Sequence, residues 1–192
     1  METELLSEAR RCLDSLDLTK ALSLCRDAVA HSPADADAHA MLGEVCLQPG
    51  SLEEAESALL RSVELTASGG AGRYMYLGQL ADGPQSLQWY ERGVDILRSQ
   101  RSAAESASGE REELQARWLE TTQALAIGLC AIAELYLSDL CFEADAEERC
   151  EALASEALDL VKPLEVKKRK KKKREREKRK GLGRGLFADQ PC

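Results

Sequence analysis

The sequence predicts an all-helical solenoid of about four helix pairs, and three observations lead to that prediction. Aromatic residues make up only 4% of the 192 residues, and the abundant Ala, Leu and Glu favour helices over strands. Small and apolar residues recur at a fixed separation of 34 residues. The longest apolar run covers only residues 124–133, well short of the ~20 residues that a membrane-spanning helix needs.

Two series of residues carry the 34-residue repeat, which indicates stacked units of one kind. The first series is Leu5, Ala9, Cys12, Ala21, Cys25, Ala28 and Pro33, and the second is His39, Gly43, Cys46, Ala55, Leu59, Ser62 and Ala67. The small residues recur where two helices must approach closely. Ser51 and Glu54 have the spacing of a capping box, which predicts that the second helix of this unit begins after Ser51.

Two further units follow along the chain. The third is carried by Tyr74, Leu77, Gly78, Ser86, Tyr90 and Gly93. Residues 99–109 are rich in Ser, Ala and Gly, which predicts an inserted loop between repeats. A fourth helix pair is expected over roughly residues 112–140 and 146–160, with Pro163 ending its second helix. We therefore expect a repeat domain over residues 1–162 and a separate segment over residues 163–192.

The residue pattern resembles that of the tetratricopeptide repeat. The second unit matches best, with Leu42 and Gly43 followed by Cys46, Ala55 and Leu59. It differs from the family in having His, Cys and Leu at positions that are usually aromatic. The resemblance implies helix pairs that stack into a superhelix, with a concave groove that binds peptides and is lined by the first helix of each pair.

Charge divides the chain into an acidic body and a basic tail. Residues 1–161 hold 12 basic and 30 acidic side chains, whereas residues 162–192 hold 14 basic and 4 acidic ones. An acidic body favours basic partners and speeds their capture. The candidate client-binding residues, chosen by repeat phase and by proximity to the last turn, are Asp37, Glu44, Met75, Gln79, Asp82, Glu134, Asp139, Glu143 and Asp145. The alternative is that these acids form an ordinary solvated helix face.

The basic run over residues 167–180 contains 12 basic residues among 14 and no aromatic residue. We expect it to be disordered and to act as a nuclear-targeting segment that importin binds, with non-specific RNA contact as an alternative. The candidate targeting residues are Lys167, Lys168, Arg169, Lys170, Lys171, Lys172, Lys173 and Arg174. The expected location is the nucleus and the cytoplasm. The tail could also fold back on the acidic body at low ionic strength.

No catalytic, metal-binding or cofactor-binding pattern is predicted. The seven cysteines include no CxxC pair, and the lack of a secretory signal favours reduced thiols. Cys12, Cys25 and Cys46 fall at packing positions of the repeat, where a free cysteine acts as a small apolar side chain. His39 occupies a core position and His31 lies near a helix end, so neither suggests catalysis. A non-enzymatic binding protein is therefore expected.

Residues 74–80, 90–93 and 135–151 are also similar to segments of a small eukaryotic family of assembly chaperones. That resemblance covers residues 5–162 and implies capture of a large-subunit ribosomal protein (L-four) through its basic internal loop. It implies sequestration in an acidic groove, without chemistry on the client. The Lys and Asn clamp of tetratricopeptide-repeat co-chaperones is not possible here, because the chain has no Asn and only Lys20 before Lys162. A general scaffold or adaptor is the alternative.

Overall fold

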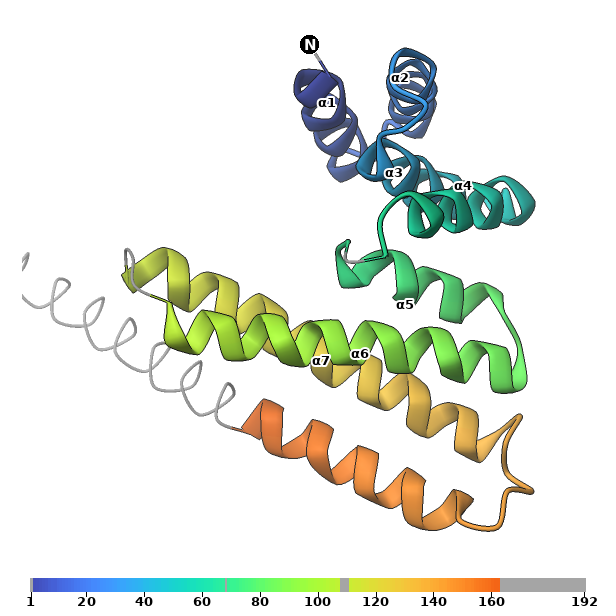
Figure 1. Ribbon diagram of the computed structural model, residues 1–192, viewed down its shortest axis with the longest axis vertical. Coiled ribbons are helices and arrows are strands. Elements are labelled where there is room, and N and C mark those ends of the chain that lie inside the picture. Colours follow the sequence, from blue (N-terminus) through green and yellow to red (C-terminus); the bar gives the residue numbers. More distant parts are fainter. Residues whose placement is uncertain (1, 68, 108–110, 163–192) are drawn as a thin grey trace, which may run out of the picture.

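The computed structural model describes residues 2–67, 69–107 and 111–162, and these residues form helices and turns without a strand (Figure 1). The helices are α1 (Glu2–Asp14), α2 (Leu18–His31), α3 (Ala36–Leu47), α4 (Leu52–Leu65), α5 (Ala71–Leu80), α6 (Gly83–Ser106) and α7 (Arg111–Leu137). A further helix covers residues 146–162. The predicted all-helical fold is confirmed. Among these described helices, none has the length and apolar character of a membrane span.

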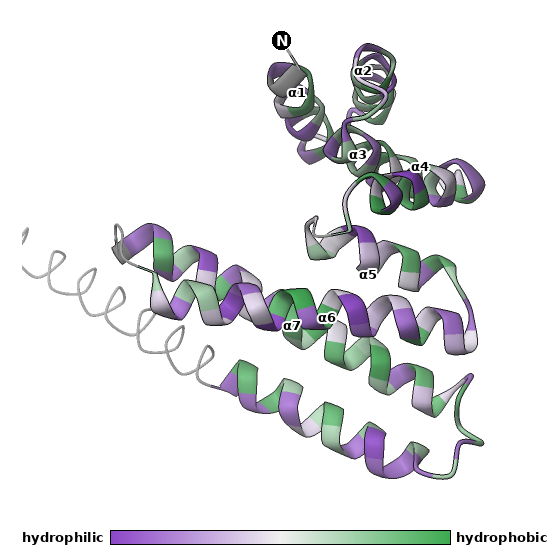
Figure 2. Cartoon of the chain, viewed as in Figure 1, coloured by the Kyte–Doolittle hydropathy of each residue, from purple (hydrophilic) through white to green (hydrophobic). Residues whose placement is uncertain are grey.

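The helices form antiparallel pairs that stack one on the next (Figure 1). α1 packs on α2, α3 on α4 and α5 on α6, while α7 shares a core with the helix over residues 146–162. Contacts between α1 and α3 and between α3 and α5 join the first helices of successive pairs. Polar and apolar residues alternate along every helix (Figure 2), as expected for helices that bury one face. The four predicted pairs are therefore all present.

The glycines of the repeat mark the closest approach of the two helices in a pair. A Cβ atom on Gly43 would lie 2.5 Å from Leu59 Cγ, and one on Gly78 would lie 2.8 Å from the Tyr90 ring. Both separations are shorter than any real carbon–carbon contact, so only glycine lets these helices pack at this distance. Glycine therefore recurs at positions 43 and 78 because each faces a large side chain of the paired helix.

Two apolar clusters form the interior, one over α1–α4 and one over α5 to the helix at residues 146–162. Polar bonds at the junction of the clusters hold α5 against the second pair. The Tyr74 hydroxyl donates to the Ala67 carbonyl at 2.6 Å. The Arg73 guanidinium, which is 3% exposed, donates to the Ser62 carbonyl at 3.1 Å. Ser62 in turn donates to the Ala36 carbonyl at 2.6 Å.

The prediction of a loop over residues 99–109 is wrong for residues 99–106, because α6 continues as a helix to Ser106. Tertiary contacts with α7 account for the difference. Trp118 of α7 donates from Nε1 to the Glu105 carboxylate at 3.0 Å, and the Arg101 guanidinium lies 5.6 Å from the Trp118 ring centroid. An ion pair of 3.3 Å between Arg101 and Glu105 supports the same turn of α6. Residues 108–110 lie outside the described residues.

The capping box expected at α4 does not form, although α4 begins after Ser51 as predicted. Ser51 is the N-cap residue of α4, but its side chain makes no capping hydrogen bond. Glu54 instead accepts from the Arg26 guanidinium of α2, with its closest approach at 2.9 Å. A carboxylate gains more from a charged guanidinium than from a backbone amide, so a contact between repeats replaces the local cap.

Candidate functional site

The first helices of the first three pairs line a pocket of about 280 Å³ on their shared face. α1 contributes one residue, α3 four, and α5 with its preceding turn four. This is the face that the repeat pattern assigns to a concave groove. Two of the predicted contact residues, Asp37 and Glu44, line this pocket.

Ion pairs between repeats balance the charge of this pocket. Arg10 donates to both oxygens of Glu44, with Nη1–Oε1 at 2.5 Å and Nη2–Oε2 at 2.8 Å. Arg73 Nη2 donates to Asp37 Oδ1 at 2.9 Å. The hydrogen bonds that Arg10 donates to Glu44 raise the pKa of Arg10 above its usual value, although partial burial opposes them. The pocket therefore presents both signs of charge rather than an acidic surface alone.

Tyr76 forms the aromatic part of the same pocket. Burial, with a smaller contribution from the Glu44 carboxylate, raises the pKa of Tyr76 to about 12. The phenol therefore stays protonated at neutral pH and can donate a hydrogen bond. With Met41 beside it, the pocket combines an apolar patch with two ion pairs, an arrangement that suits a peptide backbone and a charged side chain.

Four other predicted residues gather at one edge of the solenoid, near the turns that precede α6 and the helix over residues 146–162. Asp82 is the N-cap residue of α6, and Asp139 Oδ2 accepts from the Gly83 amide at 3.1 Å. Glu143 and Asp145 line a small pocket of about 220 Å³. The structure therefore brings these acids together, but it separates them from Asp37 and Glu44, which line a different pocket.

Arg149 offsets part of the negative charge at this edge. It donates to Asp145 at 2.6 Å and to the Tyr136 hydroxyl at 2.7 Å, and its guanidinium lies 5.5 Å from the centroid of the Tyr136 ring. These hydrogen bonds raise the pKa of Arg149 above its usual value. The Glu143 side chain is exposed and makes no hydrogen bond or ion pair among the described residues. The same holds for the Asp82 side chain, so both carboxylates are free to meet a partner.

The remaining three predicted residues occupy different environments. Gln79 and Glu134 are exposed on α5 and α7. Met75 is packed, because its Sδ would lie 2.5 Å from a Cβ on Gly93 and its Cε 2.7 Å from one on Gly128. We expected Met75 to face a groove. Its flexible side chain instead fills the space between α5, α6 and α7.

Repeat phase did not predict the basic and aromatic members of the pocket, which are Arg10, Arg73 and Tyr76. One signal was present in the sequence. Arg10 follows Ala9, Glu44 follows Gly43, and Ala9 and Gly43 are equivalent positions 34 residues apart. Opposite charges at equivalent positions of adjacent repeats predict an ion pair across the repeat boundary. No comparable spacing points to Arg73 or Tyr76.

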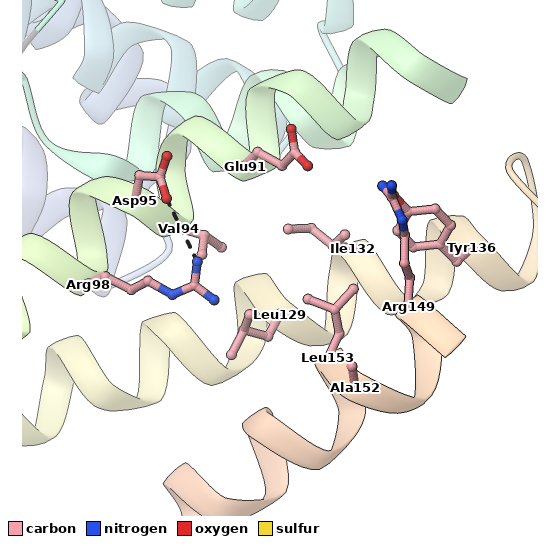
Figure 3. A pocket seen from close by; sticks show the side chains of 10 residues that line it. All are labelled: Glu91, Val94, Asp95, Arg98, Leu129, Ile132, Tyr136, Arg149, Ala152 and Leu153. Atoms are coloured by element: carbon pink, nitrogen blue, oxygen red, sulfur yellow. Dashed lines mark hydrogen bonds and ion pairs between the residues drawn. The ribbon is translucent and has the colours of Figure 1, made fainter. Parts of the chain in front are cut away.

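A larger pocket, of about 530 Å³, lies between α6, α7 and the helix over residues 146–162 (Figure 3). Val94, Leu129 and Ile132 form its apolar floor, and Leu153 reaches over them from the opposite side. Glu91, Asp95 and Arg98 of α6 stand along one rim. The sequence did not indicate this pocket, because it forms where three helices from two repeats meet.

Three of the six described cysteines occupy the packing positions that the sequence predicted, whereas Cys130 and Cys141 are exposed and Cys150 is half-buried. Cys12, Cys25 and Cys46 are buried in the first cluster. Burial raises the pKa of the Cys25 thiol to about 12 and that of Cys46 to about 11, so both thiols are protonated and unreactive at neutral pH. No group of metal-ligating side chains occurs within the part of the chain that the structure describes. Cys192 lies outside it.

Comparison with known proteins agrees with this architecture. The family model described as tetratricopeptide repeat matches residues 13–68, which cover the second half of the first helix pair and the whole second pair. Together with the stacked pairs and their spacing of 34 residues, this match shows tetratricopeptide repeats over residues 13–68. The fold is a tetratricopeptide-type solenoid.

Two relatives of this chain share one description. It is 33% identical over 165 residues to a probable assembly chaperone of rpl4 from Schizosaccharomyces pombe, a match that covers 83% of this chain and 46% of the relative. A probable assembly chaperone of rpl4 from Emericella nidulans is 30% identical over 179 residues, covering 83% of this chain and 40% of the relative. The chain thus spans less than half the length of these curated relatives.

One solved structure is similar to this chain along its whole length. The structure of an assembly chaperone of RpL4 (Acl4, residues 1–338) superposes with a TM-score of 0.77 at 28% sequence identity, covering 100% of this chain and 77% of that one. The arrangement of helix pairs is therefore shared with that chaperone.

Proposed function

We propose that this chain is an assembly chaperone for a ribosomal protein. The client would be the counterpart of rpl4, which the names of its relatives give, and the chain would act during assembly of the large ribosomal subunit. The observation that carries the proposal is the match to the RpL4 assembly chaperone along the whole chain. Two relatives with a higher sequence identity to this chain have the same client in their names. The proposal concerns the portion of the relatives that this chain spans.

Charge supports binding of a basic client. Residues 1–161 carry 30 acidic side chains against 12 basic ones, and ribosomal proteins are basic because they bind RNA. A negative surface attracts such a client over a distance of about 10 Å at 0.1 M salt and competes with RNA for it. The mechanism is sequestration, in which the client is shielded until RNA replaces the chaperone.

We place client contact at two surfaces. The pocket on α1, α3 and α5 offers Tyr76 and two ion pairs to a peptide, and the edge around Glu143 offers exposed carboxylates. Basic side chains of a client can replace Arg10 or Arg149 as partners of these carboxylates. The predicted contact residues are compatible with this arrangement, except for the packed Met75.

A second candidate function, a general adaptor, is favoured by one observation. Arg10 and Arg73 neutralise Glu44 and Asp37 in the first pocket, so this pocket has no local excess of negative charge. Such a site suits peptides of mixed composition as well as strongly basic ones. Salt dependence separates the two functions. The affinity for a basic client falls as salt screens the charges, whereas affinity that comes from apolar contacts does not.

The deciding experiment is a binding titration of the full chain with the purified equivalent of rpl4 at increasing salt. Tight binding at low salt that weakens steeply, by roughly tenfold or more as salt rises severalfold, supports the chaperone. Affinity for that protein no higher than for an unrelated protein of equal charge contradicts it. Isolation of many unrelated partners with salt-independent affinity supports the adaptor.

We also propose that the basic run over residues 167–180, which lies outside the described residues, directs the chain to the nucleus through importin. The chain would then be present in both the cytoplasm and the nucleus, as expected for a protein that accompanies a client between them. Replacing the run's Lys and Arg by Gln in a fluorescently tagged chain should abolish nuclear accumulation. Unchanged accumulation contradicts the proposal. Salt-sensitive RNA binding that the same change removes would assign the run to RNA contact.

A further inference from the structure

The pocket between α6, α7 and the helix over residues 146–162 has an apolar floor and an excess of negative charge. Val94, Leu129 and Ile132 lie beneath the opening (Figure 3). Arg98 is paired with Glu156 of the opposite helix at 2.9 Å and lies 3.8 Å from Asp95. The Glu91 side chain is exposed and has no hydrogen bond or ion pair among the described residues.

A second pocket extends this surface toward the edge of the solenoid, because Tyr136 and Arg149 line both. The second pocket adds the carboxylates of Glu143 and Asp145. Over the combined surface, carboxylates outnumber guanidinium groups. The carboxylates are those of Glu91, Asp95, Glu143 and Asp145, against the guanidinium groups of Arg98 and Arg149. An occupant of this surface should therefore combine several positive charges with a few apolar side chains.

We propose that the C-terminal segment of this same chain occupies the surface, with the basic run of residues 167–180 along its carboxylates and Leu186 and Phe187 on its apolar floor. The segment has the required chemistry, because the run holds 12 basic residues and the two apolar residues follow it closely. The pocket on α1, α3 and α5 is a poorer partner, because its two guanidinium groups equal its two carboxylates in number and leave no excess of negative charge.

Chain length permits this arrangement. The described residues end at residue 162, on the helix that forms one wall of the pocket. Leu153 lies nine residues before that point, or about 14 Å along the helix. The 24 residues from 162 to 186 can span up to about 80 Å when extended, so the segment can return along the wall and reach the floor. A tether of this length keeps its effective concentration near the millimolar range.

Docking of the segment has a consequence for any basic partner. The basic run would neutralise the carboxylates that attract such a partner, and it would have to leave before the partner could use this surface. The inference is independent of the proposed client, because it concerns only the chain and its own C-terminal residues.

Zero-length carbodiimide crosslinking of the full chain tests the proposal directly, since it joins a lysine amine to a carboxylate only when the two are in contact. The chain should be dilute, at low salt, and mixed as equal parts of isotopically light and heavy protein. We expect crosslinks within one molecule from the run to Glu91, Asp95 or Glu143. Glu53 and Glu56 serve as the internal control, because they are exposed on α4 without a hydrogen bond or ion pair among the described residues.

Three results would overturn the proposal. They are equal crosslinking to Glu53 and Glu56, crosslinks found only between light and heavy molecules, and no crosslink to the pocket at all. The first would show general attraction to acidic surfaces, and the second would assign the pocket to the tail of another copy.

A variant separates docking from charge attraction alone. Leu186→Ser with Phe187→Ser leaves every charge in place, and it should lower the yield of crosslinks to the pocket several-fold. The matched control is Leu164→Ser with Val166→Ser, which removes two apolar side chains ahead of the run and should leave the yield unchanged. Equal yields from both variants would contradict a role for the apolar floor. Because both variants change residues beyond the described helices, the helical body stays intact.

Discussion

Arg10 and Glu44 occupy equivalent positions of adjacent repeats and form a two-point ion pair across the boundary between them. Glu44 is 18% exposed and Arg10 is 43% exposed, so the pair sits at the edge of the first pocket rather than in the core. It couples the packing of the first two repeats to the shape and charge of a candidate binding surface.

Removing this pair should loosen the repeat boundary modestly. Because Arg10 is partly exposed, a double-mutant cycle with Arg10→Gln and Glu44→Gln should give a coupling free energy of about 0.5–1 kcal/mol. Urea unfolding followed by circular dichroism measures it. Additive single changes would show that the pair contributes no net stability. The exposed pair Arg61–Glu64 within α4 is the control and should couple less strongly.

Gly43→Val should destabilise the second repeat, because its Cβ would meet Leu59 Cγ at 2.5 Å. Overpacking of this kind typically costs about 1–3 kcal/mol, which a lower midpoint of urea unfolding would reveal. Gly72→Ala is the matched control, since its nearest contact is an ordinary 3.9 Å to Tyr76. Equal midpoints for Gly43→Val and wild type would mean that α3 and α4 can move apart without cost.

Reversing exposed carboxylates should weaken binding of a basic client without disturbing the fold. Glu134→Lys with Glu143→Lys changes two exposed acids and avoids Asp139 and Asp145, which accept structural hydrogen bonds. We expect roughly a tenfold loss of affinity at low salt, measured by calorimetry, with normal helix content. Glu53→Lys with Glu56→Lys on α4 makes the same charge change elsewhere. If both double variants lose affinity equally, net charge rather than this surface controls binding.

Stability should fall as the pH rises above about 9. The Cys25 pKa is raised from 9.0 to about 12 in the fold, so the unfolded state loses this proton first and is favoured increasingly between those values. The contribution is fully present below pH 9 and lost as pH approaches 12. Denaturant unfolding at a series of pH values should show a shallower decline for Cys25→Ala. A decline of the same steepness would exclude Cys25 as its source.

The helical part of α6 beyond residue 98 should depend on its contacts with α7. Trp118→Ala removes both the hydrogen bond to Glu105 and the stacking partner of Arg101, which together stabilise this region by about 1.4 kcal/mol. Amide hydrogen exchange of residues 99–106 should then accelerate by roughly tenfold. Unchanged exchange would show that this segment is helical by its own propensity. Trp89→Ala, which alters the opposite end of α6, is the control.

The sequence by itself determined the features that depend on spacing. The separation of 34 residues predicts the helix pairs. Gly43 and Gly78 predict the close contact of the two helices within a pair, because only small residues permit it. The burial of Cys12, Cys25 and Cys46 follows from the same phase. Charge composition indicated a basic partner, since net charge needs no structure to be counted.

The tertiary structure decided which neighbours each side chain has. Residues 99–106 look like a loop in sequence, but contacts with Trp118 of the facing helix, α7, hold them in a helix. Glu54 forms an ion pair between repeats rather than a cap, and Met75 fills a gap between three helices. Arg73 and Tyr76 line the first pocket, and the pocket of about 530 Å³ forms where two repeats meet. Periodicity specifies which face of a helix is buried, whereas contacts between repeats depend on side-chain lengths and helix positions that a repeat pattern does not contain.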